Sequence, residues 1–568
     1  MQRKSSPPSL MSAIFAIVFV LPVIAGVQVE KSNHGILSGT VISVNEGPIE
    51  GVLVSARKAG SPITVTVVSD QNGQYAFPAA KLTPGQYSLS IRAAGYQLIS
   101  PKIVDLPAQT AVDLKIDHTV DISSQLSSAE WLNSFPGTHE EKSFLLNCVL
   151  CHTLERIAKS HHDPDEWLAV FDRMATYNAV DSTSRPQKGI GGSSARYGNP
   201  ERLRQQAEYM STINLSHAPK WPYRLTTFPR PKGPATRVVI TEYDLPRRDT
   251  LPHDLAVDAR GNVWYADAGY NYIGELDPKT GKTVEYSVPV LRPDYPLGLL
   301  DIEFDKQGNL WIAPWLQANK FITFGTNALN FATWDIPKGE NDKDIPLLAF
   351  LMPSQDDVDG KVWGTDARGK IFRLDIHSGD VETFSVFDVF HEGASAEGHS
   401  MASDQQGHSV YQVTADSENN CYFMDTGGSI GRIDAKTLEI TFYPTPTPNS
   451  YPRRGHMDAH EGLWFGEYRG DRIGFFDTNA KQFREWLAPN PWTATYEVAP
   501  DANGQVWAAG VTSDRIQKLN PKTGETIEYL LPRYTDARRL SFDDSGKQLK
   551  VWIPNKNSAS LIELEPLE

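Results

Sequence analysis

Hydrophobic and polar residues alternate along the chain between residues 35 and 117. Stretches such as "LSGTVIS", "GVLVSARK" and "ITVTVVSDQNGQYAF" show this alternation, and Asn-Gly and Pro-Gly turn signals separate them. A period of two is typical of strands that bury one face, and turn signals at this spacing favour antiparallel pairing. The pattern predicts a small β-sandwich over residues 35–117.

Residues 122–217 have a helical periodicity instead. In "DPDEWLAVFDRMATY", Trp167, Phe171 and Met174 recur at spacings of three and four, and "NPERLRQQAEYMSTINLS" places a capping asparagine before a proline. Both features are typical of amphipathic helices and their first turns. We expect a short all-α domain in this part of the chain.

Residues 238–568 repeat a turn followed by a tryptophan strand, as in "GNVWYA", "GNLWIA" and "GQVWAA". Seven copies occur, and strands of the type "TVEYSVP" also occur seven times, the first of them ahead of the first tryptophan strand. That first strand must complete the last unit, which closes the ring and removes a free sheet edge. The predicted fold class is multidomain and mainly β: a β-sandwich, a short all-α domain and a seven-bladed β-propeller.

Composition limits the classes of partner. With 40% hydrophobic and 22% charged residues, the 568-residue chain has the composition of a folded protein. Its net charge of −15 disfavours nucleic acid and anionic membrane surfaces as main partners, because both require a basic surface.

The N-terminus has the features of a secretory signal peptide. Arg3 and Lys4 precede the apolar run "MSAIFAIVFVLPVI", and a small-residue cleavage site ends at Ala25. The alternative is an uncleaved anchor, but the run is shorter than the roughly 20 residues of a membrane span, and it contains Pro22. We expect residues 1–25 to be removed, which leaves a periplasmic protein without a membrane span.

The most specific motif is "CVLCH", which contains Cys148, Cys151 and His152. Covalent haem c attachment needs this arrangement, because two thiols add to the haem vinyl groups and the next imidazole reaches the iron. A redox dithiol needs a βαβ context, and zinc needs a second ligand pair. The third cysteine, Cys421, lies in a propeller strand, where we expect it to pack in the core. Export and helical flanks therefore favour haem c as the cofactor.

The helical segment resembles the class I cytochrome c domain, from the "CVLCH" motif to "AEYMSTINLS". In that family a methionine is the second axial ligand, which implies Met174, with Met210 as an alternative. The remaining candidates are His161, His162, His217 or an open position. Either methionine also fits core packing. An iron with His and Met ligands carries electrons at raised potential, which implies a periplasmic electron donor or acceptor, whereas an open position binds a small ligand.

The sandwich segment resembles the carboxypeptidase regulatory-like domain. The ordered motifs that carry the resemblance are Gly39-x-Val41, Pro48-x-x-Gly51-x-x-Val54, Asp70-x-x-Gly73-x-Tyr75-x-Phe77 and Leu82-x-Pro84-Gly85-x-Tyr87-x-Leu89. The resemblance implies a non-catalytic module, and no nucleophile or metal cluster is apparent in this part of the sequence.

Polar residues recur at two neighbouring strand ends of the propeller copies. The innermost strands begin at His253, Tyr411, His456, Tyr496 and, in the last copy, Arg538. The strands that follow them end at Asp267, Asp366, Asp425 and Glu467. Because adjacent antiparallel strands begin and end on the same side, we expect these side chains around the channel mouth.

This set has the chemistry of a binding site. We predict that His253, Asp267, His456 and Glu467 hold Mg²⁺ or another divalent cation, or transfer protons to a small-molecule ligand. The alternative is that the carboxylates cap turns and the histidines face solvent.

The unit "PHDLAVDARGNVWYADAGYNYIGELDPKTGKTVEYSVP" and the whole propeller segment resemble virginiamycin B lyase, also called streptogramin lyase. That family opens an ester bond of a cyclic antibiotic by magnesium-assisted elimination. His456 and Glu467 match its histidine and downstream glutamate, which implies catalytic roles for both. The glutamate two positions before that histidine is Arg454 here, and the histidine one blade earlier is Tyr411. The Glu-x-His order of Glu397-Gly398-His399 lies in an insertion, so the lyase set is incomplete and the fold does not decide the function.

The leading hypothesis is an exported haem c electron-transfer protein whose lyase-like propeller binds or transforms a small molecule or docks a redox partner. One alternative is a divalent-metal-dependent carbon–oxygen lyase with an accessory haem. The other is a non-catalytic scaffold that binds glycan or protein.

Overall fold

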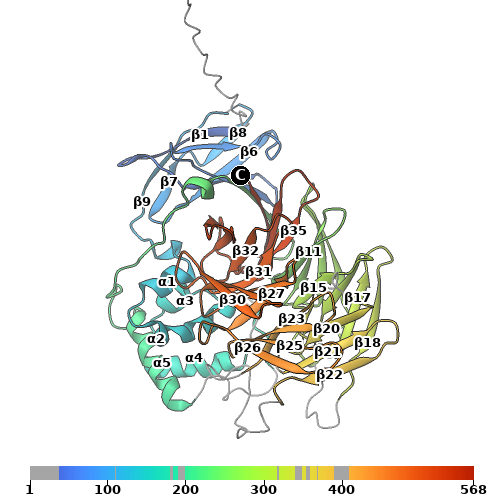
Figure 1. Cartoon of the computed structure of the whole chain (residues 1–568). Coiled ribbons are helices and arrows are strands. Elements are labelled where there is room, and N and C mark those ends of the chain that lie inside the picture. Colours follow the sequence, from blue (N-terminus) through green and yellow to red (C-terminus); the bar gives the residue numbers. More distant parts are fainter. Residues whose placement is uncertain are drawn as a thin grey trace, which may run out of the picture. The chain divides into compact units, whose positions relative to one another are not determined.

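The computed structural model describes residues 37–108, 110–178, 183, 185–189, 199–315, 317, 319–338, 348–352, 358–367, 369–388 and 408–567 (Figure 1). The predicted signal peptide, residues 1–25, and the Glu397-Gly398-His399 motif lie outside them. The described residues belong to one compact unit, Gly35–Glu568. Within these ranges, no helix is long and apolar enough to cross a membrane.

Strands β1 to β9 form the N-terminal sandwich-like domain. They are β1 (Leu37–Ser43), β2 (Gly47–Pro48), β3 (Leu53–Lys58), β4 (Ile63–Val68), β5 (Gln74–Phe77), β6 (Gly85–Arg92), β7 (Tyr96–Ser100), β8 (Ile103–Leu106) and β9 (Leu114–His118). One sheet has the order β2-β1-β9-β7, with β5 also paired to β1, and the other contains β4-β3-β6-β8. Val41, Val54 and Phe77 are fully buried in one apolar cluster, as the alternating pattern predicted.

Helices follow the sandwich. They are η1 (Ser123–Gln125), α1 (Ser128–Ser134), α2 (His139–Ser143), η2 (Phe144–Leu150), α3 (Glu155–Ala158), α4 (Pro164–Ala175) and α5 (Pro200–Ile213). Side-chain caps define where the longer helices begin: Ser127 caps α1, and Asn199 caps α5 just before its proline, as predicted. Trp131, Leu146 and Met210 are buried in a common apolar cluster, which holds these short helices together.

Residues 238–566 form the antiparallel sheets of a β-propeller (Figure 1). The first sheets are β11 (Pro252–Val257), β12 (Val263–Asp267), β13 (Tyr272–Asp277) and β14 (Lys282–Ser287); then β15 (Asp301–Phe304), β16 (Asn309–Ala313), β17 (Lys320–Gly325) and β18 (Asn330–Asp335). The next are β19 (Phe350–Leu351), β20 (Lys361–Thr365), β21 (Lys370–Asp375) and β22 (Val381–Ser385); then β23 (Val410–Ala415), β24 (Cys421–Asp425), β25 (Ser429–Ile433) and β26 (Ile440–Pro444).

The remaining propeller strands are joined into larger sheets. An eight-stranded sheet has the order β30-β29-β28-β27-β31-β32-β33-β34, in which β27 and β31 pair in parallel. Its strands are β27 (Pro452–Met457), β28 (Gly462–Glu467), β29 (Arg472–Asp477), β30 (Gln482–Leu487), β31 (Thr495–Pro500), β32 (Val506–Gly510), β33 (Arg515–Leu519) and β34 (Thr526–Leu530). The last strands are β35 (Ser541–Asp543), β36 (Lys550–Asn555) and β37 (Ser560–Pro566). Short 3-10 helices are η4 (Gly233–Thr236) and η7 (Lys556–Ser558).

The repeated tryptophan is tied to the turn that precedes it. Nε1 of Trp264 donates to the carboxylate of Asp258 at 3.3 Å, and Nε1 of Trp464 donates to Asp458 at 2.9 Å. Asp258 also accepts the backbone N–H of Asn262 at 2.9 Å. A single aspartate therefore accepts hydrogen bonds from both the turn backbone and a buried indole N–H. This double role explains why the same number of residues separates the aspartate from the tryptophan in both copies.

Strand β10 (Val238–Asp244) closes the propeller. It pairs antiparallel with β37 from Val238 opposite Pro566 onward, as the offset of the repeats predicted. Its other edge pairs with β4 of the sandwich, where Val239 lies opposite Val67. One sheet thus runs β35-β36-β37-β10-β4-β3-β6-β8, and the sandwich covers an edge that would otherwise be open. Sequence patterns do not reveal this second pairing.

Candidate functional site

The "CVLCH" motif lies at the end of η2. This helix contains Cys148 and ends at Leu150; the backbone nitrogen of the next residue, Cys151, lies 3.5 Å from the carbonyl oxygen of Cys148. Leu146 and Val149 are buried in the helical cluster and anchor the turn. Both cysteines are half-buried, and neither forms a disulfide with a described cysteine, so one turn presents two thiols.

His152 is held by a bond to the main chain. Its Nδ1 lies 2.9 Å from the carbonyl oxygen of Thr153. A carbonyl only accepts, so Nδ1 carries the proton and Nε2 has the free electron pair. Burial lowers the pKa of His152, which favours the neutral ring. Histidines that bind metals are oriented by the same kind of bond.

The Cys148 thiol does not have the lowered pKa of an activated dithiol. Burial, with Cys151 adding, raises the pKa of Cys148 to about 12, so this thiol is protonated at neutral pH. Catalytic dithiols have a lowered pKa instead. Cys421 in β24 is fully buried in an apolar cluster, as expected.

The motif segment lies against the propeller. The hydroxyl of Tyr468 donates to the carbonyl oxygen of Leu146 at 3.1 Å, and Nη2 of Arg538 donates to that of Leu150 at 3.3 Å. Nζ of Lys556 also donates to the Leu150 carbonyl. These three bonds join residues that are 322, 388 and 406 positions apart in the sequence. The motif segment is therefore in direct contact with the propeller.

The two methionine candidates lie on different helices. Met174 is half-buried on α4. Met210, on α5, is fully buried in the apolar cluster against which Cys148 packs. The structure thus brings Met210 into the same cluster as the motif, and the identity of the second axial ligand stays a prediction.

The histidine candidates for the iron have other surroundings. Nδ1 of His161 lies 3.0 Å from the carbonyl oxygen of Leu215, and Nδ1 of His162 lies 3.7 Å from the carboxylate of Glu166. His217 is exposed.

The structure confirms the predicted strand ends for His253, Asp267 and Glu467, but the prediction for His456 is wrong, because His456 lies opposite Trp464 near the end of β27. Pro252, next to His253, lies opposite Asp267 in the β11–β12 register, and Pro452 lies opposite Glu467 in the β27–β28 register. The side chains of the four predicted residues nevertheless have separate partners.

His253 and Asp267 are both buried. Nδ1 of His253 lies 2.7 Å from the carboxylate of Asp254 and 2.9 Å from the carbonyl oxygen of Leu300. Burial lowers the pKa of His253 well below its usual value, so the ring is neutral. Asp267 pairs with Arg247 at 2.7 Å and accepts two backbone N–H groups. It therefore caps a turn.

His456 and Glu467 are also separate. Nε2 of His456 lies 2.7 Å from the carboxylate of Glu497. Burial acts to raise the pKa of Glu497, but Arg539 and other cations outweigh it and hold this pKa at about 2. Glu467 is fully buried, and neither of its oxygens has a hydrogen-bond partner among the described residues. Burial, with Glu485 nearby, raises the pKa of Glu467 to about 9, so it is protonated at neutral pH.

A metal at the propeller face stays a prediction. In the described part of the chain, no group of three or more His, Cys, Asp or Glu side chains is arranged to hold a metal ion. The four residues that the sequence singled out for a cation are His253, Asp267, His456 and Glu467.

Sequence reasoning missed a buried network of arginines and carboxylates. Arg454 bonds to Asp254 at 2.8 Å and to Asp301 at 3.0 Å, and all three are fully buried. Arg538 pairs with Asp536 at 2.8 Å. The available signal was the Arg-Arg doublet in "PRRGHM" and "ARRL", because charges inside short apolar strands need partners when they are buried.

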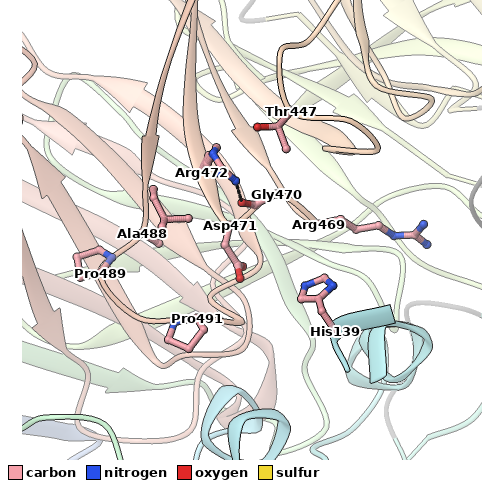
Figure 2. A pocket seen from close by; sticks show the side chains of 10 residues that line it. His139, Thr447, Arg469, Gly470, Asp471, Arg472, Ala488, Pro489 and Pro491 are labelled. Atoms are coloured by element: carbon pink, nitrogen blue, oxygen red, sulfur yellow. Dashed lines mark hydrogen bonds between the residues drawn. The ribbon is translucent and has the colours of Figure 1, made fainter. Parts of the chain in front are cut away.

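A cavity of about 350 Å³ lies between α2 and the loop that joins β28 to β29. Figure 2 shows His139 of α2 beside Arg469 of that loop, with Asp471 near both. The His139 ring stacks on Trp492 with 4.1 Å between ring centres. Burial, together with Lys142 and Arg469, lowers the pKa of His139. The helical segment thus completes a cavity on the propeller.

These features define a β-propeller protein with an N-terminal regulatory-like domain. The family model for the carboxypeptidase regulatory-like domain matches residues 36–119. No curated protein matches the sequence.

Part of the chain is also similar to solved structures. The chain is similar to virginiamycin B lyase from Staphylococcus aureus, with 20% identity and a TM-score of 0.47 over 58% of this chain and 99% of that one. It is also similar to a streptogramin B lyase, with 20% identity and a TM-score of 0.48 over 59% and 99% of the two chains. A similarity of 20% identity does not show that this chain has the activity of those lyases.

Proposed function

We propose that the chain is an exported electron-transfer protein whose "CVLCH" motif binds haem c. The observation that supports this is the arrangement at the end of η2. Two thiols that form no disulfide with a described cysteine lie within one turn, and Nδ1 of the following His152 donates to the Thr153 carbonyl. This donor set fits haem c, which needs two thiols and an imidazole with an unprotonated Nε2.

The residues have distinct roles in this proposal. Cys148 and Cys151 would hold the haem through S–C bonds to its two vinyl groups, with each thiol proton going to the neighbouring carbon and no net oxidation. Cys148 would supply both sulfur and proton, because its raised pKa keeps it protonated. His152 would ligate the iron through Nε2, with Met174 or Met210 as the second ligand. The bound haem supplies a one-electron carrier.

We further propose that residues 238–568 form seven blades and that the face in contact with the motif docks a periplasmic redox partner or binds a small molecule. Tyr468, Arg538 and Lys556 support this role, because they bond to the motif segment from the propeller. A molecule bound at this face lies next to the proposed haem.

A divalent-metal-dependent lyase is the second candidate. Glu467 favours it, since a buried carboxyl group without a hydrogen-bond partner is a possible ligand for a cation such as Mg²⁺. Two observations oppose it: Arg454 occupies the place of the glutamate in the lyase motif, and His456 is already bonded to Glu497.

The test of the first candidate is covalent haem. The full-length chain is produced in a periplasm with a haem c maturation system, and pyridine haemochrome spectra and intact mass are recorded. We expect one haem per chain, and none in the Cys148→Ser/Cys151→Ser double variant. A wild-type chain without covalent haem would contradict the proposal.

The test of the second candidate uses the same preparation. A lyase predicts chelator-sensitive opening of a streptogramin ester, lost in Glu467→Gln and retained in the exposed control Glu439→Gln. Ester opening that ignores a chelator, or no opening at all, excludes it.

A further inference from the structure

Arg453, in β27, is buried among four tyrosines and is only 8% exposed. Its Cζ lies 4.2 Å from the ring centre of Tyr411, 4.4 Å from Tyr468, 4.7 Å from Tyr451 and 5.4 Å from Tyr496. Nε has no hydrogen-bond partner, and we find no ion pair for this guanidinium within the described ranges. We call these five residues the tyrosine cage.

Arg453 differs from the other buried arginines around it. Those arginines have carboxylate partners: Arg454 with Asp254 at 2.8 Å, Arg538 with Asp536 at 2.8 Å, and Arg539 with Glu303 at 2.6 Å. Arg538 even shares a tyrosine with the cage, since its Cζ lies 5.6 Å from the ring centre of Tyr496. The carboxylates of this network therefore pair with the other three arginines. Among the residues that the structure describes, Arg453 has no carboxylate partner.

An uncompensated buried guanidinium is costly. Desolvation of an ion costs more free energy than one cation–π contact returns. Burial acts to lower the pKa of Arg453, but the surrounding tyrosines keep it above its usual value, so the group stays charged. The four tyrosine rings attract the cation, but they give its N–H groups no hydrogen-bond acceptor.

One hydroxyl of the cage is also unused. The hydroxyls of Tyr411 and Tyr496 bond to each other, and that of Tyr468 donates to Leu146. Tyr451 is half-buried, and its hydroxyl makes no hydrogen bond with any residue that the structure describes. A guanidinium fork and a phenol donor together have the chemistry that recognises a carboxylate.

The cage lies beside the haem c motif. Tyr468 contacts Arg453 through its ring and the Leu146 carbonyl through its hydroxyl. At the other end of η2, Arg538 holds the Leu150 carbonyl. Tyr468 therefore joins the Arg453 guanidinium to the helix that carries Cys148.

We propose that Arg453 and the Tyr451 hydroxyl form a carboxylate-binding site at the face of the propeller that meets the motif. The carboxylate comes either from a propionate of the haem or from a free small molecule. The first source rests on the proposed function, and the second does not. Arginine suits the site because its planar fork binds a carboxylate through two parallel hydrogen bonds.

The experiment measures acetate binding to the full-length chain. Haem-free protein is titrated with sodium acetate at constant ionic strength against sodium chloride, by calorimetry and by the thermal midpoint of unfolding. We expect acetate, and not chloride, to bind and to raise the midpoint. Arg453→Gln should weaken acetate binding at least tenfold, and Arg453→Lys should weaken it as well, because an ammonium group lacks the fork. Arg204→Gln, on the exposed side of α5, should bind acetate as the wild type does.

The haem-loaded chain identifies the source. Acetate binding that disappears once haem is attached assigns the site to a propionate, and binding that persists assigns it to a free carboxylate. A chain that takes up no haem defeats the proposed function but leaves the haem-free titration decisive. The carboxylate site is overturned if wild-type protein shows no acetate dependence, or if Arg453→Gln and Arg453→Lys retain it.

Discussion

The hydroxyl of Tyr468 donates a hydrogen bond of 3.1 Å to the carbonyl oxygen of Leu146, and both residues are buried. The bond ties η2, which carries Cys148, to the loop after β28. A net hydrogen bond contributes about 1 kcal/mol, and its loss leaves a buried carbonyl without this partner. The geometry of the motif therefore depends on the propeller.

Tyr468→Phe tests this dependence. We expect the free energy of unfolding to fall by about 1–2 kcal/mol and iodoacetamide to modify Cys148 faster in haem-free protein, because η2 loses an anchor. Urea unfolding and peptide mass spectrometry measure the two effects. Tyr286→Phe, which removes a hydroxyl bonded to Glu275, is the control and should leave Cys148 unchanged. Equal modification rates in all three proteins would contradict the anchoring role.

The reactivity of Cys148 should depend steeply on pH. Burial raises the pKa of this thiol to about 12, so the thiolate fraction at pH 8 is about one in ten thousand. In haem-free protein, we expect alkylation of Cys148 to be slow at pH 8 and about tenfold faster for each pH unit up to pH 11. A plateau near pH 8 or 9 would show an ordinary or activated thiol instead.

Glu467 should make stability depend on pH. Its pKa is about 9 in the folded protein and about 4.3 in the unfolded chain, so the folded state retains a proton that the unfolded state has lost. Its contribution is complete below pH 4 and declines as pH rises towards 9. Glu467→Gln cannot ionise at this position. We expect its free energy of unfolding to rise relative to that of the wild type by up to about 1.4 kcal/mol per pH unit between about pH 4 and pH 9.

Urea unfolding at several pH values measures this difference, and the exposed Glu439→Gln is the control. A constant difference between Glu467→Gln and the wild type from pH 5 to 8.5 would contradict the raised pKa. Addition of Mg²⁺ at pH 8 is a useful further arm, because a cation bound at Glu467 would stabilise the wild type alone.

The sandwich and the propeller should unfold cooperatively, because ion pairs connect them. Nζ of Lys81 lies 2.6 Å from Glu563 and 2.5 Å from Glu565, both on β37. We expect Lys81→Met to lower stability by about 1–3 kcal/mol, because Glu563 is left buried with a weaker partner. Lys58→Met, within the sandwich, should have a smaller effect.

Calorimetry tests the cooperativity. Because β4 and β10 belong to one continuous sheet, the sandwich should unfold in the same transition as the last propeller strands. A separate early transition for the sandwich in the wild type would contradict this.

Periodic features of the fold were predictable from the sequence. The alternation around Val41 and Val54 predicted the sandwich, and the offset of the repeats predicted that β10 closes on β37. The cap at Asn199 was also predictable. Each of these depends on the order of neighbouring residues or on regular spacing, and hydrophobic burial acts on that pattern directly.

The sequence predicted the candidate site only where its residues are close together along the chain. Cys148, Cys151 and His152 lie within one short stretch of sequence, so they were visible as a motif. His253 and Glu467 were placed at the correct strand ends, but the sequence did not show that the first is bonded to Asp254 and that the second lies next to Glu485.

The sequence by itself therefore determined the order of the elements, the closing strand and the presence of the "CVLCH" motif. The tertiary structure alone decided which charges meet. Arg454 finds Asp254 at a distance of 200 residues along the chain, while its neighbour Arg453 is surrounded by tyrosines. The physical reason is that a buried charge is stabilised by partners from other strands, and local periodicity does not record which strands come together.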